Sequence, residues 1–263
     1  MSRQERKKPG NQTAENNEEL VIGRQAVLEA LRYGSPLQVL LAEGCRGSII
    51  DEITALAGRK KITAERLARD DFEGKTGGIP GSQGTAAIMP PFEYSTLDDL
   101  IGRTKTSDEE PFLLMLDHID DPRNLGAVMR TADAAGVHGL IIPGDRAAGI
   151  TAAVRKVAAG AAERLPVAKV VNLNSAAERL KAEGFWLYGA EADGDDYFYK
   201  ADFRRPIVLV LGSEGRGISR LLRKNCDLIV SIPMPGHSGS LNISAAAAVL
   251  IYAALSQRKE WSG

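Results

Sequence analysis

Cysteine, histidine and aromatic residues are scarce in this chain of 263 residues, which contains 2 cysteines, 3 histidines and 5% aromatic residues. Cys45 and Cys226 stand far apart, with no CxxC pair and no cluster of cysteine and histidine, so the sequence predicts neither a disulfide framework nor a zinc site. His118, His138 and His237 lack the spacing of metal ligands. We therefore expect no metal centre, and we interpret His138 as a residue that packs or caps beside a turn.

Long hydrophobic runs are also missing. No run of about 18 apolar residues occurs, so no transmembrane helix is indicated. The chain start, MSRQERKKPG, is charged and lacks the apolar core of a secretory signal. The composition, 44% hydrophobic and 25% charged, is typical of globular proteins. We expect a cytoplasmic protein without a membrane partner.

Neither sign of charge dominates the chain, because 33 basic and 34 acidic residues give a net charge of -1. From Glu109 onward there are 18 basic and 18 acidic residues, so a surface that binds nucleic acid would be a patch rather than a whole face. Of these 18 basic residues 12 are arginine, whose planar guanidinium favours phosphate recognition.

The chain divides into four segments by composition. Residues 1–18 are polar and charged, which is typical of a disordered tail. Residues 19–91 predict a small α/β domain, and residues 92–109, where only Leu97, Leu100 and Ile101 are regularly spaced apolar residues, predict a linker. In the small domain the pattern predicts a helix between Gly23 and Gly34, a strand at 39–41, a helix at 49–56, a helical turn at 64–68, a loop at 75–84 and a strand at 85–89.

Residues 110–263 alternate short apolar runs with helical patterns. We predict strands at 112–116, 140–142, 167–171, 185–190, 207–211 and 228–232, and helices at 124–135, 151–165, 175–183, from 218 and from 241. Strands that are apolar throughout, alternating with helices, predict a parallel sheet covered by helices on both faces.

Three polar, glycine-containing loops follow predicted strands, at 117–126, 212–217 and 233–240. Because ligands of such sheets bind at the carboxyl ends of the strands, we expect these loops to form one site. The loop GSEGRG at 212–217 has the order GxxGxG rather than that of the dinucleotide fingerprint, and no GxxxxGK[ST] motif occurs. The run HSGS at 237–240 resembles a serine hydrolase elbow but fails the GxSxG pattern.

Several polar residues stand out in these segments. Asn124 begins a predicted helix, and Arg130 interrupts its apolar pattern, either as a surface residue or as a phosphate or hydroxyl contact at the shared site. Glu214, between glycines at a strand end, is a candidate partner for Arg130. Asn242 or Ser244 is expected to cap the final helix. The four alanines that follow, 245–248, predict a helix that its neighbours approach closely.

The three loops with their flanking elements resemble the three motifs of the SpoU/TrmH group of SPOUT RNA ribose methyltransferases. The segments are DHIDDPRNLGAVMRTADAAGVHGLIIP, LVLGSEGRGIS and IPMPGHSGSLNISAAAAVLIYAA, and the resemblance covers about residues 110–257. It implies a SPOUT-type parallel sheet with a deep C-terminal trefoil knot, S-adenosylmethionine bound in a bent form within the knot, and a homodimer formed through this domain. The alanines would then be small because the last helix threads the knot.

The resemblance also implies roles for individual residues. Backbone groups around Gly212, Ile232 and Leu241 would cradle the cofactor, and the catalytic set would be Asn124, Arg130, Glu214, Ser240 and Asn242. The family assigns activation of the ribose 2′-hydroxyl to the arginine. Since arginine stays protonated up to about pH 12, we assign Arg130 to contact with the hydroxyl and the adjacent phosphate, which leaves open whether it also accepts the proton.

Residues 19–91 resemble the ribosomal-protein-like RNA-binding domain of family members that modify large-subunit rRNA. This resemblance implies a guanosine of 23S rRNA as substrate, although Ser82 stands where these domains usually carry histidine. Two alternatives stay open: a ribose methyltransferase acting on tRNA or on another rRNA site, and a non-catalytic RNA-binding factor of ribosome assembly.

Overall fold

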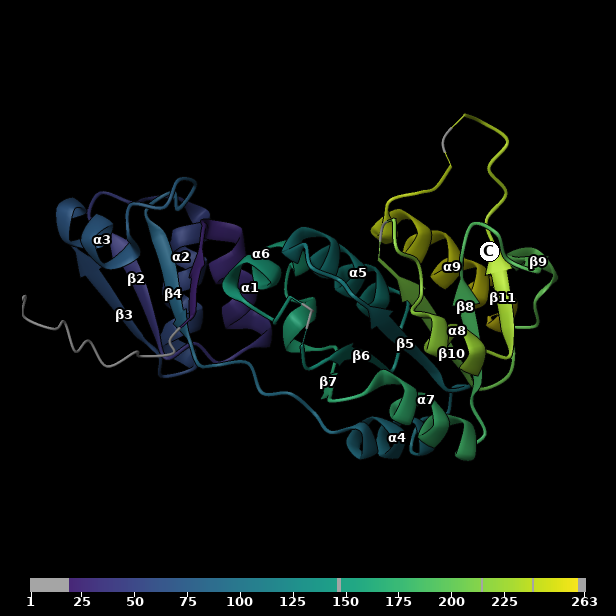
Figure 1. Ribbon diagram of the computed structural model, residues 1–263. Coiled ribbons are helices and arrows are strands. Elements are labelled where there is room, and N and C mark those ends of the chain that lie inside the picture. Colours follow the sequence, from purple (N-terminus) through teal and green to yellow (C-terminus); the bar gives the residue numbers. More distant parts are fainter. Residues whose placement is uncertain (1–18, 146–147, 214, 238, 260–263) are drawn as a thin grey trace, which may run out of the picture.

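The structure is a computed structural model, and it describes residues 19–145, 148–213, 215–237 and 239–259 (Figure 1). The predicted tail at 1–18 lies outside the described residues. Within them the chain forms a four-stranded sheet followed by a seven-stranded sheet. No helix among them is long and apolar enough to cross a membrane.

The first sheet has the order β1-β4-β2-β3. Its strands are β1 Glu19–Ile22, β2 Gln38–Ala42, β3 Thr63–Leu67 and β4 Thr85–Met89, and its helices are α1 Arg24–Tyr33, α2 Ser48–Arg59 and α3 Arg69–Thr76. Helices α1 and α2 cover one face, where apolar residues such as Val27, Leu31 and Ile53 are buried. Helix α3 covers the other face through Phe72.

One prediction for this region was wrong, and two elements were missed. The helical turn predicted at 64–68 is strand β3, because it pairs with the edge of β2 in parallel register. Strand β1 was missed, although it pairs with β4 in antiparallel register. Helix α3 was missed as well, since Phe72 is its main apolar contact and a single apolar residue gives no periodicity.

The second sheet is parallel throughout, in the order β7-β6-β5-β10-β8-β11-β9. Its strands are β5 Phe112–Asp117, β6 Gly139–Pro143, β7 Val167–Val170, β8 Trp186–Ala190, β9 Asp196–Tyr197, β10 Ile207–Gly212 and β11 Leu228–Ser231. The helices are α4 Leu97–Lys105, α5 Pro122–Ala134, α6 Ala152–Ala158, α7 Leu173–Ala182, α8 Arg220–Asn225 and α9 Ile243–Arg258, with short 3-10 turns at Ala161–Glu163 and Phe198–Lys200.

Alternate residues of the central strands supply two separate cores, which is why these strands are apolar throughout. In β5, Leu114 and Leu116 pack with α5, α6 and α9 on one face. Leu113 and Met115 pack with α4, α7 and α8 on the other. The predicted α/β class, a parallel sheet with helices on both faces preceded by a small α/β region, is confirmed. The knot implied by the resemblance stays a prediction.

Two helix boundaries and the expected linker differ from the prediction. Helix α5 is capped by Asp121, which accepts a hydrogen bond from Arg123 N, rather than by Asn124. Helix α6 ends at Ala158 instead of continuing to 165, because Ala159 and Gly160 both have positive φ. Residues 92–109 contain α4, which begins with a capping box between Thr96 and Asp99 and packs on the second sheet.

The four alanines of α9 do not share one environment. Ala247 is fully buried, whereas Ala245 is exposed. Further along, Val249 and Tyr252 are 38% and 47% exposed. The composition of this helix predicts close packing on every side. In the single chain, close packing is found only on the face of the helix that carries Ala247.

The two sheets are joined through helix α6 and the turn that follows it. Arg155 is 6% exposed. It donates to Glu163 Oε1 at 2.9 Å and to the carbonyl of Pro90 at 3.2 Å, and its guanidinium lies 5.6 Å from the centre of the Phe92 ring. Arg164 stacks on Tyr33 at 4.0 Å. These contacts place the N-terminal sheet against α6 (Figure 1).

His138 gives the stability of this fold a pH dependence. Its Nδ1 accepts a hydrogen bond from Phe112 N at 3.2 Å and its Nε2 lies 2.9 Å from Ser107 Oγ, so the ring is neutral with its proton on Nε2. Burial lowers the pKa of His138 below its ordinary value of 6.5. The unfolded chain therefore binds the proton first as the pH falls, and the stabilisation, complete above about pH 6.5, decreases below it.

We expect His138→Asn, whose side-chain oxygen can accept the Phe112 N–H without titrating, to remove this component. Urea unfolding of both proteins between about pH 8 and about pH 5.5 gives their free energies of unfolding. The difference between the two free energies isolates His138, because both proteins contain the same carboxylates. The stability advantage of the wild type should shrink below about pH 6.5. An advantage that stays constant over this range would contradict the assignment.

Candidate functional site

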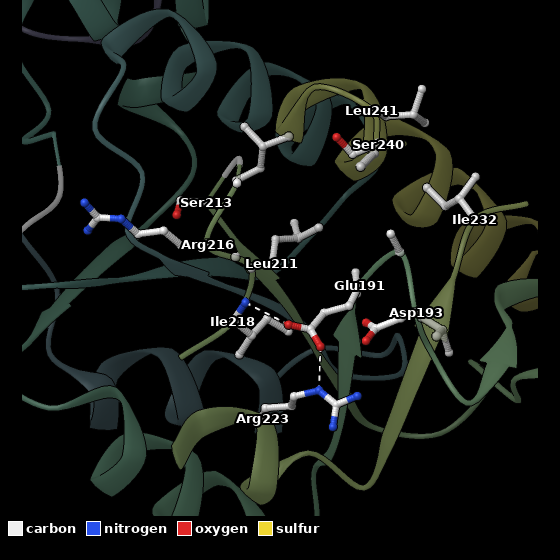
Figure 2. Close-up of a pocket in the computed structure, with 18 of the residues that line it drawn as sticks. Glu191, Asp193, Leu211, Ser213, Arg216, Ile218, Arg223, Ile232, Ser240 and Leu241 are labelled. Carbon is white, nitrogen blue, oxygen red and sulfur yellow. Dashed lines mark hydrogen bonds and ion pairs between the residues drawn. The ribbon is translucent and has the colours of Figure 1, made fainter. Parts of the chain in front are cut away.

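A cavity of about 710 Å³ opens at the carboxyl ends of β8, β10 and β11 (Figure 2). Its size falls within the range of about 300–1,000 Å³ that small-molecule sites occupy. Buried or half-buried apolar side chains line it, among them Leu211, Val230, Ile232 and Leu241. It lies at the sheet edge where the sequence predicted a ligand site.

The described residues of the glycine-rich loop, 212, 213 and 215–217, form one wall of the cavity. Gly217 N donates to the carbonyl of Ser213 at 3.0 Å, which folds the loop back on itself. A Cβ on Gly212 would lie 2.1 Å from the carbonyl carbon of Gly217, so the position requires glycine. Gly217 has φ of +64°, a conformation that favours glycine. Gly212 allows the close approach of the two chain segments, and Gly217 adopts the positive φ that the turn requires.

The segment from Ile232 to the start of α9 forms the opposite wall. Ile232, Ser240 and Leu241 line the cavity, together with Met234 and Ala246 (Figure 2). Ala246 therefore faces the cavity, not the packed core that the close-packing hypothesis required. Of the residues that the resemblance assigned to the cofactor, all three, Gly212, Ile232 and Leu241, lie on the cavity wall.

The first predicted loop, 117–126, contributes no residue to the cavity wall, but it holds the other two loops. Asp117 Oδ2 accepts from Ser219 N at 2.7 Å. Asn124 Oδ1 accepts from Asn242 Nδ2 at 3.0 Å. Asn242 also caps α9, because its Oδ1 accepts from Ser244 N at 2.9 Å. The expectation that Asn242 or Ser244 caps this helix is met by Asn242.

The predicted catalytic residues are only partly brought together. Asn124 and Asn242 are in contact, and Ser240 lines the cavity two residues before Asn242. Arg130 is exposed on α5 and is not part of the cavity wall. Glu214 lies outside the described residues, so its pairing with Arg130 stays a prediction.

Sequence reasoning missed the loop that follows β8, of which residues 191–193 line the cavity. Glu191 Oε1 accepts from Ile218 N at 3.0 Å and Oε2 accepts from Arg223 Nε at 2.5 Å (Figure 2). The hydrogen bond to Glu191 raises the pKa of Arg223 above its ordinary value. The run EADGDD at 191–196 is polar, contains glycine and follows a predicted strand, so the criterion that selected the other three loops would have selected it too.

The cavity carries charged groups of both signs. Arg216, Arg220 and Arg223 lie on its wall with Glu191 and Asp193, whereas no histidine or cysteine does so within the described residues. Nor do the described residues contain a cluster of three or more side chains suited to a metal ion. An apolar cavity with both charges at its rim suits a ligand that is apolar at one end and zwitterionic at the other.

Comparison with known proteins relates both sheets to RNA methylation. Residues 111–252 match the SpoU rRNA Methylase family, and residues 20–95 match a family described as RNA 2'-O ribose methyltransferase substrate binding. A Bacillus subtilis protein, by name a TrmH family tRNA/rRNA methyltransferase, is 40% identical over 233 residues, which are 88% of this chain and 93% of that protein.

Two solved structures are also similar. The SpoU methyltransferase AviRb from Streptomyces viridochromogenes, in complex with AdoMet, has a TM-score of 0.74 at 28% identity and covers 95% of this chain and 94% of that chain. The TrmH/SpoU tRNA modifying enzyme of A. aeolicus has a TM-score of 0.52 at 27% identity and covers 62% of this chain and 84% of that chain.

The turn at Gly212 offers a test of this geometry. Gly212→Ala should force the loop away from the sheet and destabilise the protein by about 1–3 kcal/mol, the usual cost of overpacking. Gly236→Ala is the matched control, because a Cβ there meets nothing within 4 Å. Thermal unfolding of the two variants should separate them. Equal melting temperatures would show that the loop is not closed as described.

Proposed function

The chain belongs to the SpoU rRNA methylase family, and we propose that it transfers a methyl group from S-adenosylmethionine to a ribose 2′-hydroxyl of RNA, at a guanosine of 23S rRNA. The observation that carries this proposal is the cavity itself. Two of the three segments of the matched region form its opposite walls, and the third holds them in place through Asp117 and Asn124.

The residues of the cavity fit S-adenosylmethionine. The apolar walls suit its adenine, and the tight turn at Gly212 brings backbone groups to the cavity wall. The methionine end of the molecule carries a carboxylate, an ammonium group and a sulfonium. Three arginines, Arg216, Arg220 and Arg223, line the same cavity and can pair with the carboxylate.

When bound, S-adenosylmethionine supplies an electrophilic methyl group. The positively charged sulfur that carries this methyl group is a good leaving group and needs no metal. The protein has to position the hydroxyl, and positioning alone can supply much of the rate. We assign Arg130 to the 2′-hydroxyl and the adjacent phosphate, since its exposed guanidinium can donate to both. Glu214 and Asn124 orient it, and Ser240 and Asn242 shape the substrate side.

The contact between Asn124 and Asn242 supports these assignments. It joins the start of α5, which carries Arg130, to the start of α9, where Leu241 and Ile243 line the cavity. A substrate held at Asn242 would therefore lie next to the cofactor cavity.

Ribosomal RNA is favoured by the N-terminal sheet. Residues 20–95 match a substrate-binding family, whereas the similarity to the tRNA modifying enzyme of A. aeolicus spans 62% of this chain. At the position where related domains carry histidine, Ser82 completes a turn: its carbonyl accepts from Thr85 N at 2.9 Å. A substrate in tRNA is the second candidate, because the relative in Bacillus subtilis is named for both RNA classes.

We also propose that the protein is a homodimer that pairs through α9. Ala245, Val249 and Tyr252 lie at spacings of four and three residues, on one face of the helix, and all three are exposed in the single chain. We call this the exposed α9 face. A second copy would bury these apolar side chains beside the cofactor cavity.

The proposed reaction is tested with Arg130→Ala. We expect it to abolish methyl transfer while leaving the melting temperature and the binding of S-adenosylmethionine unchanged, because Arg130 is exposed and is not part of the cavity wall. The variant and the wild type are each returned to a strain that lacks the protein, and 2′-O-methyl positions are mapped across its rRNA and tRNA.

Wild type should restore one methyl group on a guanosine of 23S rRNA, and the variant should not. A methyl group restored in tRNA or at another rRNA site would replace the substrate assignment. Full activity of Arg130→Ala would refute its role. Failure of the purified protein to bind S-adenosylmethionine in calorimetry would favour a non-catalytic RNA-binding factor.

Dimerisation is tested at the exposed α9 face. The double variant Val249→Asp/Tyr252→Asp should sediment as a monomer, since it would place two carboxylates in an apolar interface. Leu37→Asp is the control, because Leu37 is 55% exposed on the N-terminal sheet region. It should sediment like the wild type. A monomeric wild type at micromolar concentration would contradict the dimer.

A further inference from the structure

Glu191 lies between the two strands that carry the cavity walls. It follows Ala190, the last residue of β8, which pairs with Leu211 of β10 on one side and Val230 of β11 on the other. Its carboxylate is mostly buried, with a side-chain exposure of 13%, and points to the glycine loop rather than to solvent (Figure 2).

Both oxygens of this carboxylate have partners from the loop and helix that follow β10. Oε1 accepts from Ile218 N at 3.0 Å and Oε2 accepts from Arg223 Nε at 2.5 Å. A Cβ on Gly217 would lie 2.7 Å from Oε1, so the carboxylate also packs directly on the end of the loop. Glu191 thus fixes the far end of the loop and the direction of a cavity arginine together.

A second carboxylate, from the strand on the other side of β10, accepts a hydrogen bond from the next backbone amide, that of Ser219. Asp117 ends β5, pairs with Gly212 in the parallel register and is 1% exposed. Its Oδ2 accepts from Ser219 N at 2.7 Å. The consecutive amides of Ile218 and Ser219 are therefore held by carboxylates from the two strands that flank β10. Of these two carboxylates, Glu191 is the one that lines the cavity.

We infer that Glu191 is a positioning residue for S-adenosylmethionine, which holds the end of the glycine loop, at Gly217 and Ile218, and the Arg223 guanidinium in the geometry that receives the cofactor. The inference rests on the proposed function of this cavity. Since both oxygens already accept hydrogen bonds from the protein, Glu191 is not assigned to chemistry at the ribose hydroxyl. Its effect is on cofactor binding rather than on methyl transfer.

Three variants separate the two contacts. Glu191→Ala removes both, Glu191→Gln keeps an acceptor for Ile218 N but loses the ion pair, and Arg223→Ala keeps the bond to Ile218 N. Asp193→Asn is the matched control, because Asp193 lines the same cavity from the same loop, is exposed, and lies two residues away. It removes one negative charge from the rim without touching the glycine loop.

Calorimetry with S-adenosylmethionine and steady-state methyl transfer to RNA measure the effect. Glu191→Ala should weaken cofactor binding at least about tenfold, as expected for lost hydrogen bonds to a charged group. The KM for the cofactor should rise in parallel, while kcat at saturating cofactor changes less than about twofold. Glu191→Gln should recover part of the affinity, and Asp193→Asn should bind like the wild type.

Amide hydrogen exchange of the cofactor-free proteins measures how well the amides at the end of the glycine loop are protected. The amides of Ile218 and its neighbours should exchange faster in Glu191→Ala than in wild type or Asp193→Asn, because the acceptor that protects them is gone. If Glu191→Ala does not fold, Glu191→Gln decides the question, since it retains an acceptor for Ile218 N and leaves Arg223 in place. A raised KM in Glu191→Gln supports the inference, and an unchanged KM overturns it.

Other results are equally decisive. Equal weakening by Glu191→Ala and Asp193→Asn would mean that negative charge at the rim, not the held loop, governs binding, and would overturn the inference. So would a loss of kcat without a change in KM. A wild-type protein that does not bind S-adenosylmethionine would instead refute the proposed function, so the two failures are distinguishable.

Discussion

The parallel alignment of the second sheet is the constraint on which the candidate site depends. Because its strands run in one direction, their carboxyl ends and the polar loops that follow them meet at one edge. The central strand, β10, leads into the glycine loop; its neighbour β5 ends in Asp117, and Glu191 directly follows the last residue of its other neighbour, β8. Two carboxylates from neighbouring strands thereby hold the amides of Ser219 and Ile218. These hydrogen bonds attach the cavity wall directly to the sheet behind it.

A second set of contacts connects the start of α9 and the start of α5 at this edge of the sheet. Asn242 caps α9 with its oxygen and donates to Asn124 at the start of α5 with its nitrogen. One side chain thus fixes the ends of two helices that pack on the same face of the sheet. Arg130 lies on α5 and the exposed α9 face on α9, so this junction connects the two helices that carry them. A dimer formed through α9 would place its interface next to the proposed chemistry.

The N-terminal sheet is held to the rest of the chain by buried as well as exposed contacts. Arg155 is almost fully buried between Glu163, the carbonyl of Pro90 and the ring of Phe92, and breaking a buried charge pair is generally costly. Tyr94 adds a hydrogen bond, since its hydroxyl accepts from Ile150 N at 2.9 Å. The region that matches a substrate-binding family therefore has a defined position relative to the cavity, which suits recognition of a folded RNA at a fixed distance.

The local sequence determined those features that depend only on residues close together in the chain. Runs such as Phe112–Leu116 and Ile207–Leu211 are apolar at every position, which predicts buried parallel strands, and the loops that follow them predict the ligand edge. Tertiary structure decided what depends on partners far away in the chain. Residues 63–67 form a strand because β2 offers them an edge, and α6 stops two residues before Gly160, where a Cβ would lie 2.9 Å from the Tyr33 ring. Glu191 belongs to the site because β8 lies between β10 and β11, an order that no local pattern contains. Periodicity and chain breakers are properties of neighbouring residues, whereas strand order and side-chain partners arise only when distant segments meet.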